Sequence, residues 1–380
     1  MNKWTFPTQI YAGPDSLNRL TAFSNESILI ICDPFLKDSP SLTYVMGLMD
    51  SKNKVTIYTD VVPDPPITHV VKGIEFMEGI KPTVIIAIGG GSCIDMSKGI
   101  AYFGRKLKHM DIKSFIAVPT TSGTGSEVTS FAVLTDSETQ IKYPLVDDAV
   151  LPDEALLTPL FVKTSPPSVT AFSGMDVLVH ALEAYVATAA NNFTDALAQQ
   201  AIELVFEYLP KCHKPTATDQ DRMSMHEASC LAGLSFNTAG LGITHSMAHQ
   251  LGAVFHIPHG RANAMLLPHI IEFNSDINKH SKSQKEYLPA VKRYATVAQI
   301  LGLSSYNKIM TVRSLVNWVQ FMLKEMDIPL SISQMGTISK EEYFNAIDRM
   351  ADAALADACT ATNPRVPTKE DVVKMYQNLW

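Results

Sequence analysis

The chain lacks long hydrophobic runs, an excess of positive charge and paired cysteines. No apolar run reaches the roughly 18 residues that a membrane helix needs, and the opening MNKWTFPTQIYAG lacks the apolar core of a signal peptide. A net charge of −7 argues against a nucleic-acid or anionic-membrane partner, because either would require a basic face. The five cysteines include no Cys-x-x-Cys pair, as expected for reduced thiols. These absences predict a cytoplasmic protein with neither a membrane nor a nucleic-acid partner.

The first part of the chain, residues 1–165, predicts an α/β domain. A chain of 380 residues is too long for one ordinary hydrophobic core, so two domains are expected. Short apolar runs in this part are typical of buried strands, and the apolar residues of 67–80 recur with helical spacing. Strand, helix and strand in that order predict a Rossmann-like parallel sheet with helices on both faces. The expected strands are residues 28–32, 55–59, 83–88 and 114–119.

The remainder, residues 166–380, predicts an all-helical second domain. Prolines cluster near residue 165 and recognisable strands stop there, which places the domain boundary at that point. Helical periodicity dominates the rest of the chain. A last helix is expected to begin at Thr368, whose hydroxyl and Asp371 three residues later form a capping-box-like start. Other expected helices are residues 193–209, 223–236, 287–302 and 312–326.

A first candidate site is the glycine turn after the third expected strand. Residues 89–92, Gly-Gly-Gly-Ser, stand between that strand and a segment with helical periodicity. The backbone N–H groups of such a turn can approach a ligand closely, and the helix N-terminus favours a phosphate. A dinucleotide pyrophosphate would fit. The turn has neither a Walker lysine nor the GxGxxG spacing, so a tight turn without a ligand is the alternative.

Asp33 and a hydroxyl-rich loop point to the same kind of ligand. Asp33 follows the first expected strand, where a carboxylate of a doubly wound fold accepts hydrogen bonds from a ribose and repels a 2′-phosphate, which favours NAD over NADP. A turn-starting aspartate before Pro34 is the alternative. The hydroxyls and amides of residues 120–136 could line a cofactor groove. Lys142 would contact cofactor oxygens or remain a solvated surface charge.

A second candidate site is rich in histidine. Five of the eleven histidines fall within residues 240–269, and a buried imidazole needs a partner for each nitrogen. Asp176 and His180 are four residues apart, so they would project from one face of a helix. A buried Asp–His hydrogen bond is the alternative for this pair. His245 and His249 repeat the spacing.

One carboxylate and three imidazoles would form a four-ligand site for a divalent metal such as ferrous iron or zinc. His259, which follows a proline at the expected start of a further helix, is another candidate ligand. Spacing alone does not choose among the five histidines, and His256 and His269 are equally well interpreted as packing or surface residues. The pattern predicts a metal-dependent enzyme: a dehydrogenase if the glycine turn binds a dinucleotide, a hydrolase if it does not.

Motifs along the whole chain resemble those of the iron-containing (group III) alcohol dehydrogenases. They are GGGSCID, PTTSGTGSEVTS, GMDVLVHALEAY, and HSMAHQLG with IPHGRANAMLLPH. Within that family, the ICDPFL, IKYPL and TNPR segments are similar to the branch that converts propionaldehyde to 1-propanol in bacterial propanediol utilisation, regenerating NAD+ inside protein-shelled microcompartments. A polyol dehydrogenase of the same fold, acting on glycerol or lactaldehyde, is the nearest rival.

The resemblance implies cofactors, partners and residue roles. The cofactors are NAD and one divalent metal, Fe2+ with Zn2+ as the alternative; the partners are a short alcohol or aldehyde, a second copy in a homodimer, and microcompartment proteins. His249 corresponds to a histidine near the substrate that is no ligand, and is the candidate for proton transfer. The implied metal ligands are Asp176, His180, His245 and His259. The implied dinucleotide contacts are Asp33, Gly90, Gly91, Ser92, Asp95, Thr120, Thr121, Leu134 and Lys142.

Overall fold

Two compact units make up the chain. The structure, a computed structural model, describes residues 5–137, 142–277 and 288–380. Unit 1 consists of residues 1–165 and 218–237, and unit 2 of residues 166–217 and 238–380. Among the described residues, none of the helices has the length and apolar character needed to cross a membrane.

Unit 1 is built on a six-stranded parallel sheet with the strand order β1-β8-β5-β4-β2-β3. Its central strands are continuous apolar runs, because both faces of the sheet are covered. β3 pairs with one edge of β2 and β4 pairs with the other edge, and β5 is then added beyond β4. The topological switch point therefore lies between β2 and β4. The strands are β1 Gln9–Ala12, β2 Ser27–Cys32, β3 Lys54–Tyr58, β4 Val84–Gly89, β5 Ser114–Pro119 and β8 Glu154–Leu157.

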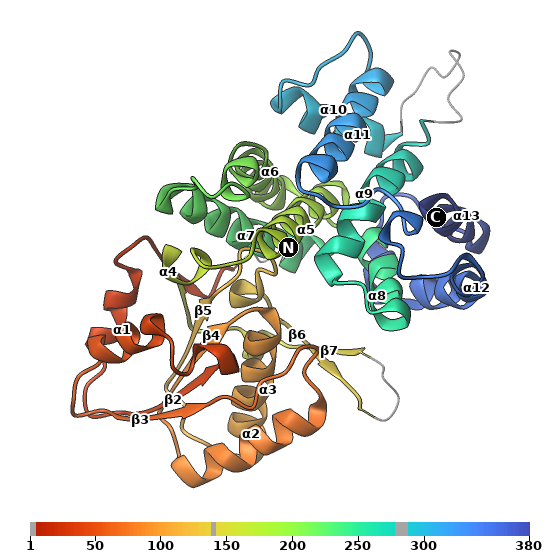
Figure 1. Ribbon diagram of the computed structural model, residues 1–380. Helices are drawn as coiled ribbons and strands as arrows, with labels where there is room; N and C mark the ends of the chain where they lie inside the picture. The colour runs from red at the N-terminus through yellow and green to blue at the C-terminus, as the bar shows by residue number, and fades with distance from the viewer. Residues whose placement is uncertain (1–4, 138–141, 278–287) are drawn as a thin grey trace. The chain divides into compact units, whose positions relative to one another are not determined.

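Helices cover both faces of this sheet, because alternate strand residues point to opposite sides. Ile31 and Ile85 pack with α2 and α3, drawn in orange in Figure 1. Ile30 and Ile86 pack on the other face with α1 and the 3-10 helix η1. The predicted α/β fold with a parallel sheet is confirmed. The helices of unit 1 that cover the sheet are η1 Ser16–Ala22, α1 Pro40–Leu48, α2 Ile67–Ile80 and α3 Gly91–Lys108, and a short α4 spans Pro159–Val162.

Four short strands escaped the sequence-based prediction. β1 and β8 pair with each other in parallel, and four residues each are too few to show a periodicity. β6, Phe131–Thr135, and β7, Lys142–Val146, form a separate antiparallel pair. Pro144 lies within β7 and weakens its strand signal, since proline has no N–H to donate to a ladder.

Unit 2 is helical, which confirms the predicted helical C-terminal part. α13 begins as expected: the Thr368 and Asp371 side chains form both hydrogen bonds of a capping box. Residue 287 of the expected helix 287–302 lies outside the described residues. The helices of unit 2 are α5 Pro167–Val186, α6 Asn192–Cys212, α8 Ile243–Phe255, α9 His259–Ser275, α10 Pro289–Ile300, α11 Lys308–Glu325, α12 Lys340–Ala356 and α13 Lys369–Leu379.

The helix α7, Asp219–Ala239, departs from the predicted division of the chain at residue 165. Its contacts place residues 218–237 in unit 1 and not in the helical unit. Met223 and Cys230 of α7 share a buried cluster with three residues of unit 1, namely Val128, Ala155 and Leu157. Helical periodicity identifies the face that a helix buries but not the partner that covers it, so the sequence assigned α7 to its neighbours along the chain.

Candidate functional site

Four side chains from α5, α8 and α9 converge within unit 2. One ligand atom from each lies within 4.8 Å of the others, in the group Asp176, His180, His245 and His259. Nε2 of His245 lies 3.9 Å, and Nε2 of His259 3.7 Å, from Oδ1 of Asp176. The rings of His180 and His245 stack with their centroids 4.6 Å apart. The structure thus brings together the four residues expected to be metal ligands, from positions up to 83 residues apart in the sequence (259 minus 176).

A glycine lets the start of α9 reach α5. His259 is the first residue of α9, and Gly260 follows it. A Cβ atom on Gly260 would lie 2.3 Å from the carbonyl oxygen of Phe172 and 3.3 Å from Cβ of Asp176. The close approach that places His259 beside Asp176 therefore requires glycine at position 260.

Gly260→Ala should destabilise unit 2 and weaken metal binding. The added methyl group meets backbone and not the end of a flexible side chain, so we expect a loss of about 1–3 kcal/mol in the free energy of unfolding. Chemical denaturation and metal content measure the two effects. Gly252→Ala is the matched control, because its Cβ would meet only the carbonyl oxygen of Ile257 at an ordinary 3.5 Å. Equal losses in both variants would contradict the argument.

Burial sets the charges in this cluster. Burial lowers the pKa of His245 well below its usual value, and the neighbouring His180 and His259 lower it further. Burial raises the pKa of Asp176, but the three histidines and a hydrogen bond from Asn263 outweigh it and hold that pKa below its usual value. The cluster therefore combines a carboxylate with a neutral imidazole at its most buried position, and these protonation states suit a divalent cation.

The residues fit a metal ion. Nε2 of His245 is buried without a hydrogen-bond partner among the described residues, and the side chain is only 2% exposed. Such an atom costs free energy unless a proton donor or a cation completes it. The side chain of His259 is 40% exposed, so the cluster is open on that side. An open side is a feature of a catalytic metal site, whereas a structural metal site is closed.

His249 lies beside this cluster without joining it. Its ring stacks on that of His259 with the centroids 5.5 Å apart, and its Nδ1 lies 2.7 Å from Oδ2 of Asp357. Burial raises the pKa of Asp357, but the hydrogen bond and charge interaction with His249, together with hydrogen bonds from Cys359, outweigh burial and bring the pKa to about 2. An ionised Asp357 therefore orients the imidazole, whose side chain is 28% exposed. This arrangement suits the predicted role in proton transfer.

The cluster leaves out the other two histidines of the stretch. His256 ends α8 in the left-handed conformation with φ 54°, and it is exposed. His269 lies inside α9, where burial lowers its pKa.

Sequence reasoning missed three supporting side chains. Asn263 donates from Nδ2 to Oδ1 of Asp176 at 2.7 Å. Glu183 lies 2.6 Å from Nδ1 of His245. Asn263 stands one helical turn after His259, and Glu183 three residues after His180, so helical spacing could have identified both. No local pattern could have identified Asp357, which lies 108 residues from its partner His249.

In unit 1, Asp33 and the glycine turn lie at the carboxyl ends of β2 and β4, the neighbouring strands that flank the switch point. The N–H of Gly90 donates to Oδ2 of Asp33 at 3.2 Å. Burial raises the pKa of Asp33, and this hydrogen bond opposes the rise. A Cβ on Gly91 would lie 2.7 Å from Cγ2 of Thr124. Close packing therefore requires glycine here, at the place where doubly wound folds bind dinucleotides.

Four further predicted contacts gather around this turn. Thr120 donates its N–H to the carbonyl oxygen of Gly89 at 3.0 Å. The side chain of Thr121 lies next to Gly90, because a Cβ atom added at Gly90 would be 3.6 Å from Cγ2 of Thr121. The other two predicted contacts, Ser92 and Lys142, both bind Asp64. The N–H of Asp64 donates to Oγ of Ser92 at 3.3 Å, and Nζ of Lys142 lies 2.6 Å from the Asp64 carboxylate.

Two further predicted contacts also bind within the protein itself. Both carboxylate oxygens of Asp95 accept hydrogen bonds, at 2.6 Å from Oγ of Ser126 and at 3.0 Å from the N–H of Val133. Asp95 therefore holds the hydroxyl-rich loop. Leu134 is 4% exposed and packs in the core beside the sheet, so it has only its backbone to offer. Their neighbour Lys98, which the sequence reasoning missed, holds the same loop by donating to the carbonyls of Thr129 and Phe131 at 2.8 and 2.6 Å.

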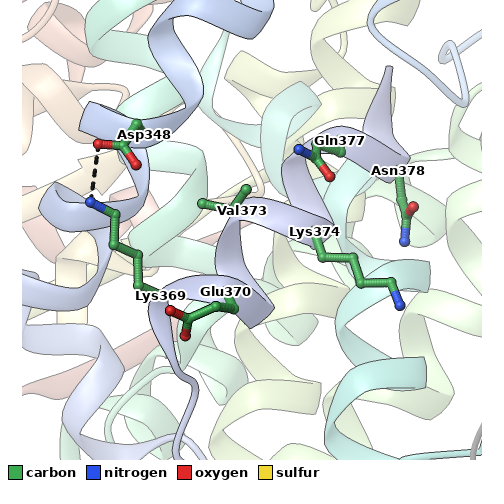
Figure 2. A pocket seen from close by; sticks show the side chains of 7 residues that line it. All are labelled: Asp348, Lys369, Glu370, Val373, Lys374, Gln377 and Asn378. Carbon is green, nitrogen blue, oxygen red and sulfur yellow. Dashed lines mark hydrogen bonds and ion pairs between the residues drawn. The ribbon is translucent and has the colours of Figure 1, made fainter.

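A surface hollow of unit 2 has a different character. Figure 2 shows it between α12 and α13, where long charged side chains line it and Lys369 reaches Asp348 at 3.0 Å. Small-molecule sites are mostly apolar with a few fixed polar groups, so we assign this hollow no catalytic role. Its lining residues are Asp348, Lys369, Glu370, Val373, Lys374, Gln377 and Asn378.

Comparison with known proteins identifies the family. Residues 7–159 match the family described as "Iron-containing alcohol dehydrogenase", and residues 170–380 match "Fe-containing alcohol dehydrogenase family, C-terminal". The chain belongs to the iron-containing alcohol dehydrogenases. This confirms the resemblance seen in the motifs, and the chain is thus an enzyme that interconverts alcohols and aldehydes.

Relatives of this iron-containing alcohol dehydrogenase span its whole length. It is 42% identical to the 1-propanol dehydrogenase PduQ of Citrobacter freundii over 100% of both chains. It is 40% identical to the NADPH-dependent butanol dehydrogenase of Clostridium saccharobutylicum over 99% of this chain and 97% of the relative. The crystal structure of a 1,3-propanediol oxidoreductase is similar with a TM-score of 0.89 at 28% identity, and covers 100% of both chains.

Proposed function

We propose that this enzyme reduces propionaldehyde and similar short aldehydes to primary alcohols with NADH, regenerating NAD+. The observation that carries the substrate class is the 42% identity to a 1-propanol dehydrogenase over the full length of both chains. The proposed iron ligands are Asp176, His180, His245 and His259. A divalent cation held there would supply Lewis acidity to the reacting oxygen, with Fe2+ as the expected metal and Zn2+ as the alternative.

Residues of unit 2 would transfer the proton that is gained or lost in the reaction. His249 is oriented by an ionised Asp357 at 2.7 Å and is 28% exposed, so it can exchange protons with solvent. In the reducing direction an imidazolium at this position donates the proton that completes the alcohol. In the oxidising direction the neutral imidazole accepts it.

Residues of unit 1 would hold the dinucleotide. The backbone of Gly90 and Gly91 at the start of α3 suits the pyrophosphate, since N–H groups at a helix N-terminus favour anions. The Asp33 carboxylate would accept hydrogen bonds from the ribose hydroxyls and repel a 2′-phosphate. The Asp33 carboxylate therefore supports NAD and not NADP as the cofactor, although the butanol dehydrogenase relative is NADPH-dependent. Further proposed contacts are Ser92, Asp95, Thr120, Thr121, Lys142 and the backbone of Leu134; Asp95 also holds the hydroxyl-rich loop.

Partners and location follow from the same resemblance. We propose a homodimer that works in the cytoplasm, inside a bacterial microcompartment, because the ICDPFL, IKYPL and TNPR segments are similar to the propanediol-utilisation branch. Light scattering measures the oligomeric state. Co-sedimentation with purified microcompartments tests encapsulation, and an enzyme that stays entirely in the soluble fraction would contradict it.

A substrate and cofactor panel tests the proposed activity. The Fe2+-loaded enzyme should oxidise NADH with propionaldehyde at a kcat/KM above that for glyceraldehyde, lactaldehyde or 3-hydroxypropionaldehyde. A preference for the hydroxylated aldehydes would favour the polyol alternative, which the likeness to a 1,3-propanediol oxidoreductase supports. Ester hydrolysis without NADH consumption would favour the hydrolase. Elemental analysis of the purified protein decides between iron and zinc.

Asp357→Asn should lower kcat by about 100-fold without reducing metal content. Asparagine can still accept the Cys359 N–H hydrogen bond that Asp357 accepts at 2.9 Å, but it lacks the charge that orients His249. A positioned proton-transfer group typically contributes this much or more. The exposed Asp352→Asn on α12 is the control, and equal activities of the two variants would remove Asp357 from the proton path.

A further inference from the structure

Glu183 is a buried carboxylate whose bonds converge on the start of α8. It is 3% exposed and stands on α5, three residues after His180. Its oxygens accept the N–H of Gly242 at 2.9 Å and the N–H of Thr244 at 2.7 Å, and Nδ1 of His245 lies 2.6 Å away. Because both oxygens already accept backbone N–H groups, the ionised form fits these contacts.

This contact fixes the tautomer of His245. An ionised carboxylate only accepts hydrogen bonds, so the proton of a neutral imidazole at 2.6 Å must sit on Nδ1. Nε2 then carries the lone pair. That atom is buried without a hydrogen-bond partner among the described residues and lies 3.9 Å from Oδ1 of Asp176. Glu183 thereby turns the donor atom of His245 toward the other ligands.

The same carboxylate fixes the position of α8, together with Asn363 of the TNPR segment. Oδ1 of Asn363 accepts the N–H of Ile243 at 3.2 Å, so the acceptors cover three successive N–H groups at the helix N-terminus. A Cβ on Gly242 would lie 2.7 Å from Oε1 of Glu183 and 2.9 Å from Oδ1 of Asn363. Asn274 holds Asn363 in turn, with its Oδ1 2.8 Å from Nδ2 of Asn363.

We propose that Glu183 is the positioning residue of the metal centre. It selects the His245 tautomer that can bind a metal, and it anchors the first turn of α8, which carries that histidine. Asn363 completes the anchor. The TNPR segment, which lies far from the proposed cofactor contacts in sequence, thereby helps to position α8. This inference rests on the proposed metal site at Asp176, His180, His245 and His259, and it assigns to Glu183 a function in affinity, not in the chemical step.

Metal affinity measured with Co2+ tests the proposal. In Glu183→Gln the side-chain length is kept, but one backbone N–H or Nδ1 of His245 must face an amide NH2. We expect the Kd for Co2+, from competition with a chromophoric chelator, to rise by about 10- to 100-fold. The visible absorption bands of bound Co2+ should shift, because the ligand set is less firmly oriented. The circular dichroism spectrum should remain that of the parent.

The matched control is Glu154→Gln, which alters a buried glutamate of unit 1 paired with Arg19 at 2.6 Å. It should leave Co2+ affinity unchanged. A Glu183→Gln variant with the parent Kd and spectrum would overturn the proposal while leaving the metal site intact. A parent enzyme that binds no Co2+ would overturn both.

A second measurement does not depend on a variant that folds. In the parent enzyme without metal, 15N spectra of labelled histidine report which ring nitrogen carries the proton. We expect His245, assigned by its absence in His245→Gln, to be protonated at Nδ1. Protonation at Nε2 would overturn the proposed role of Glu183.

Discussion

His259→Ala should abolish metal retention and lower kcat/KM for propionaldehyde reduction by about a thousandfold. His259 is the most exposed of the four clustered side chains, at 40% against 2% for His245, and Nε2 lies 3.7 Å from Oδ1 of Asp176. Its loss leaves two imidazoles and one carboxylate. A Lewis-acid metal contributes several kcal/mol to such reactions, and each 1.36 kcal/mol is about tenfold in rate.

Elemental analysis and steady-state kinetics on the same sample measure this effect. The matched control is His256→Asn, three residues earlier. His256 is exposed with φ 54°, a left-handed conformation that asparagine tolerates. The control should keep its metal and its activity. If His259→Ala retained full metal and full turnover, His259 would not belong to the site.

Asp33→Ser should raise the ratio of kcat/KM with NADPH to that with NADH by about 10- to 100-fold. Asp33 follows β2 at the switch point, and serine can still accept the Gly90 N–H hydrogen bond that Asp33 accepts at 3.2 Å. The substitution removes the negative charge that would face a 2′-phosphate. Removing the repulsion between the Asp33 carboxylate and a nearby 2′-phosphate, at an intermediate dielectric constant, is worth a few kcal/mol. Each 1.4 kcal/mol changes an affinity about tenfold.

The control for that switch is Asp38→Ser, which removes the same charge from an exposed position shortly after Asp33. It should leave the cofactor ratio unchanged. Initial rates at several concentrations of each dinucleotide give both ratios. An unchanged ratio in Asp33→Ser would mean that this carboxylate does not face the adenosine ribose, and NAD specificity would need another cause.

Local patterns predicted the parts of the molecule that are decided locally. The run at residues 28–32 is apolar throughout because β2 is covered on both faces, and such a run can be recognised without knowing its neighbours. The capping box at Thr368 needs only residues within one turn. The spacing of Asp176 and His180 likewise depends only on helical geometry.

Long-range contacts account for what the sequence alone did not reveal. Asp357 meets His249 across 108 residues, and Asn363 meets Ile243 across 120. The Asp95 carboxylate also accepts hydrogen bonds from Ser126 and Val133, and only their positions in the folded loop reveal this. A motif identifies residue types that can bind a ligand or take part in a reaction, whereas packing decides which partner each residue contacts.

The return of α7 to unit 1 makes the enzyme difficult to divide. A fragment ending at residue 165 would expose Val128 and Leu157, which Met223 and Cys230 cover in the intact chain. The complementary fragment would carry α7 with its apolar face in water, a liability for aggregation. A chimaera that exchanges the α/β portion between relatives must therefore carry this helix with it, through two additional junctions near residues 218 and 237.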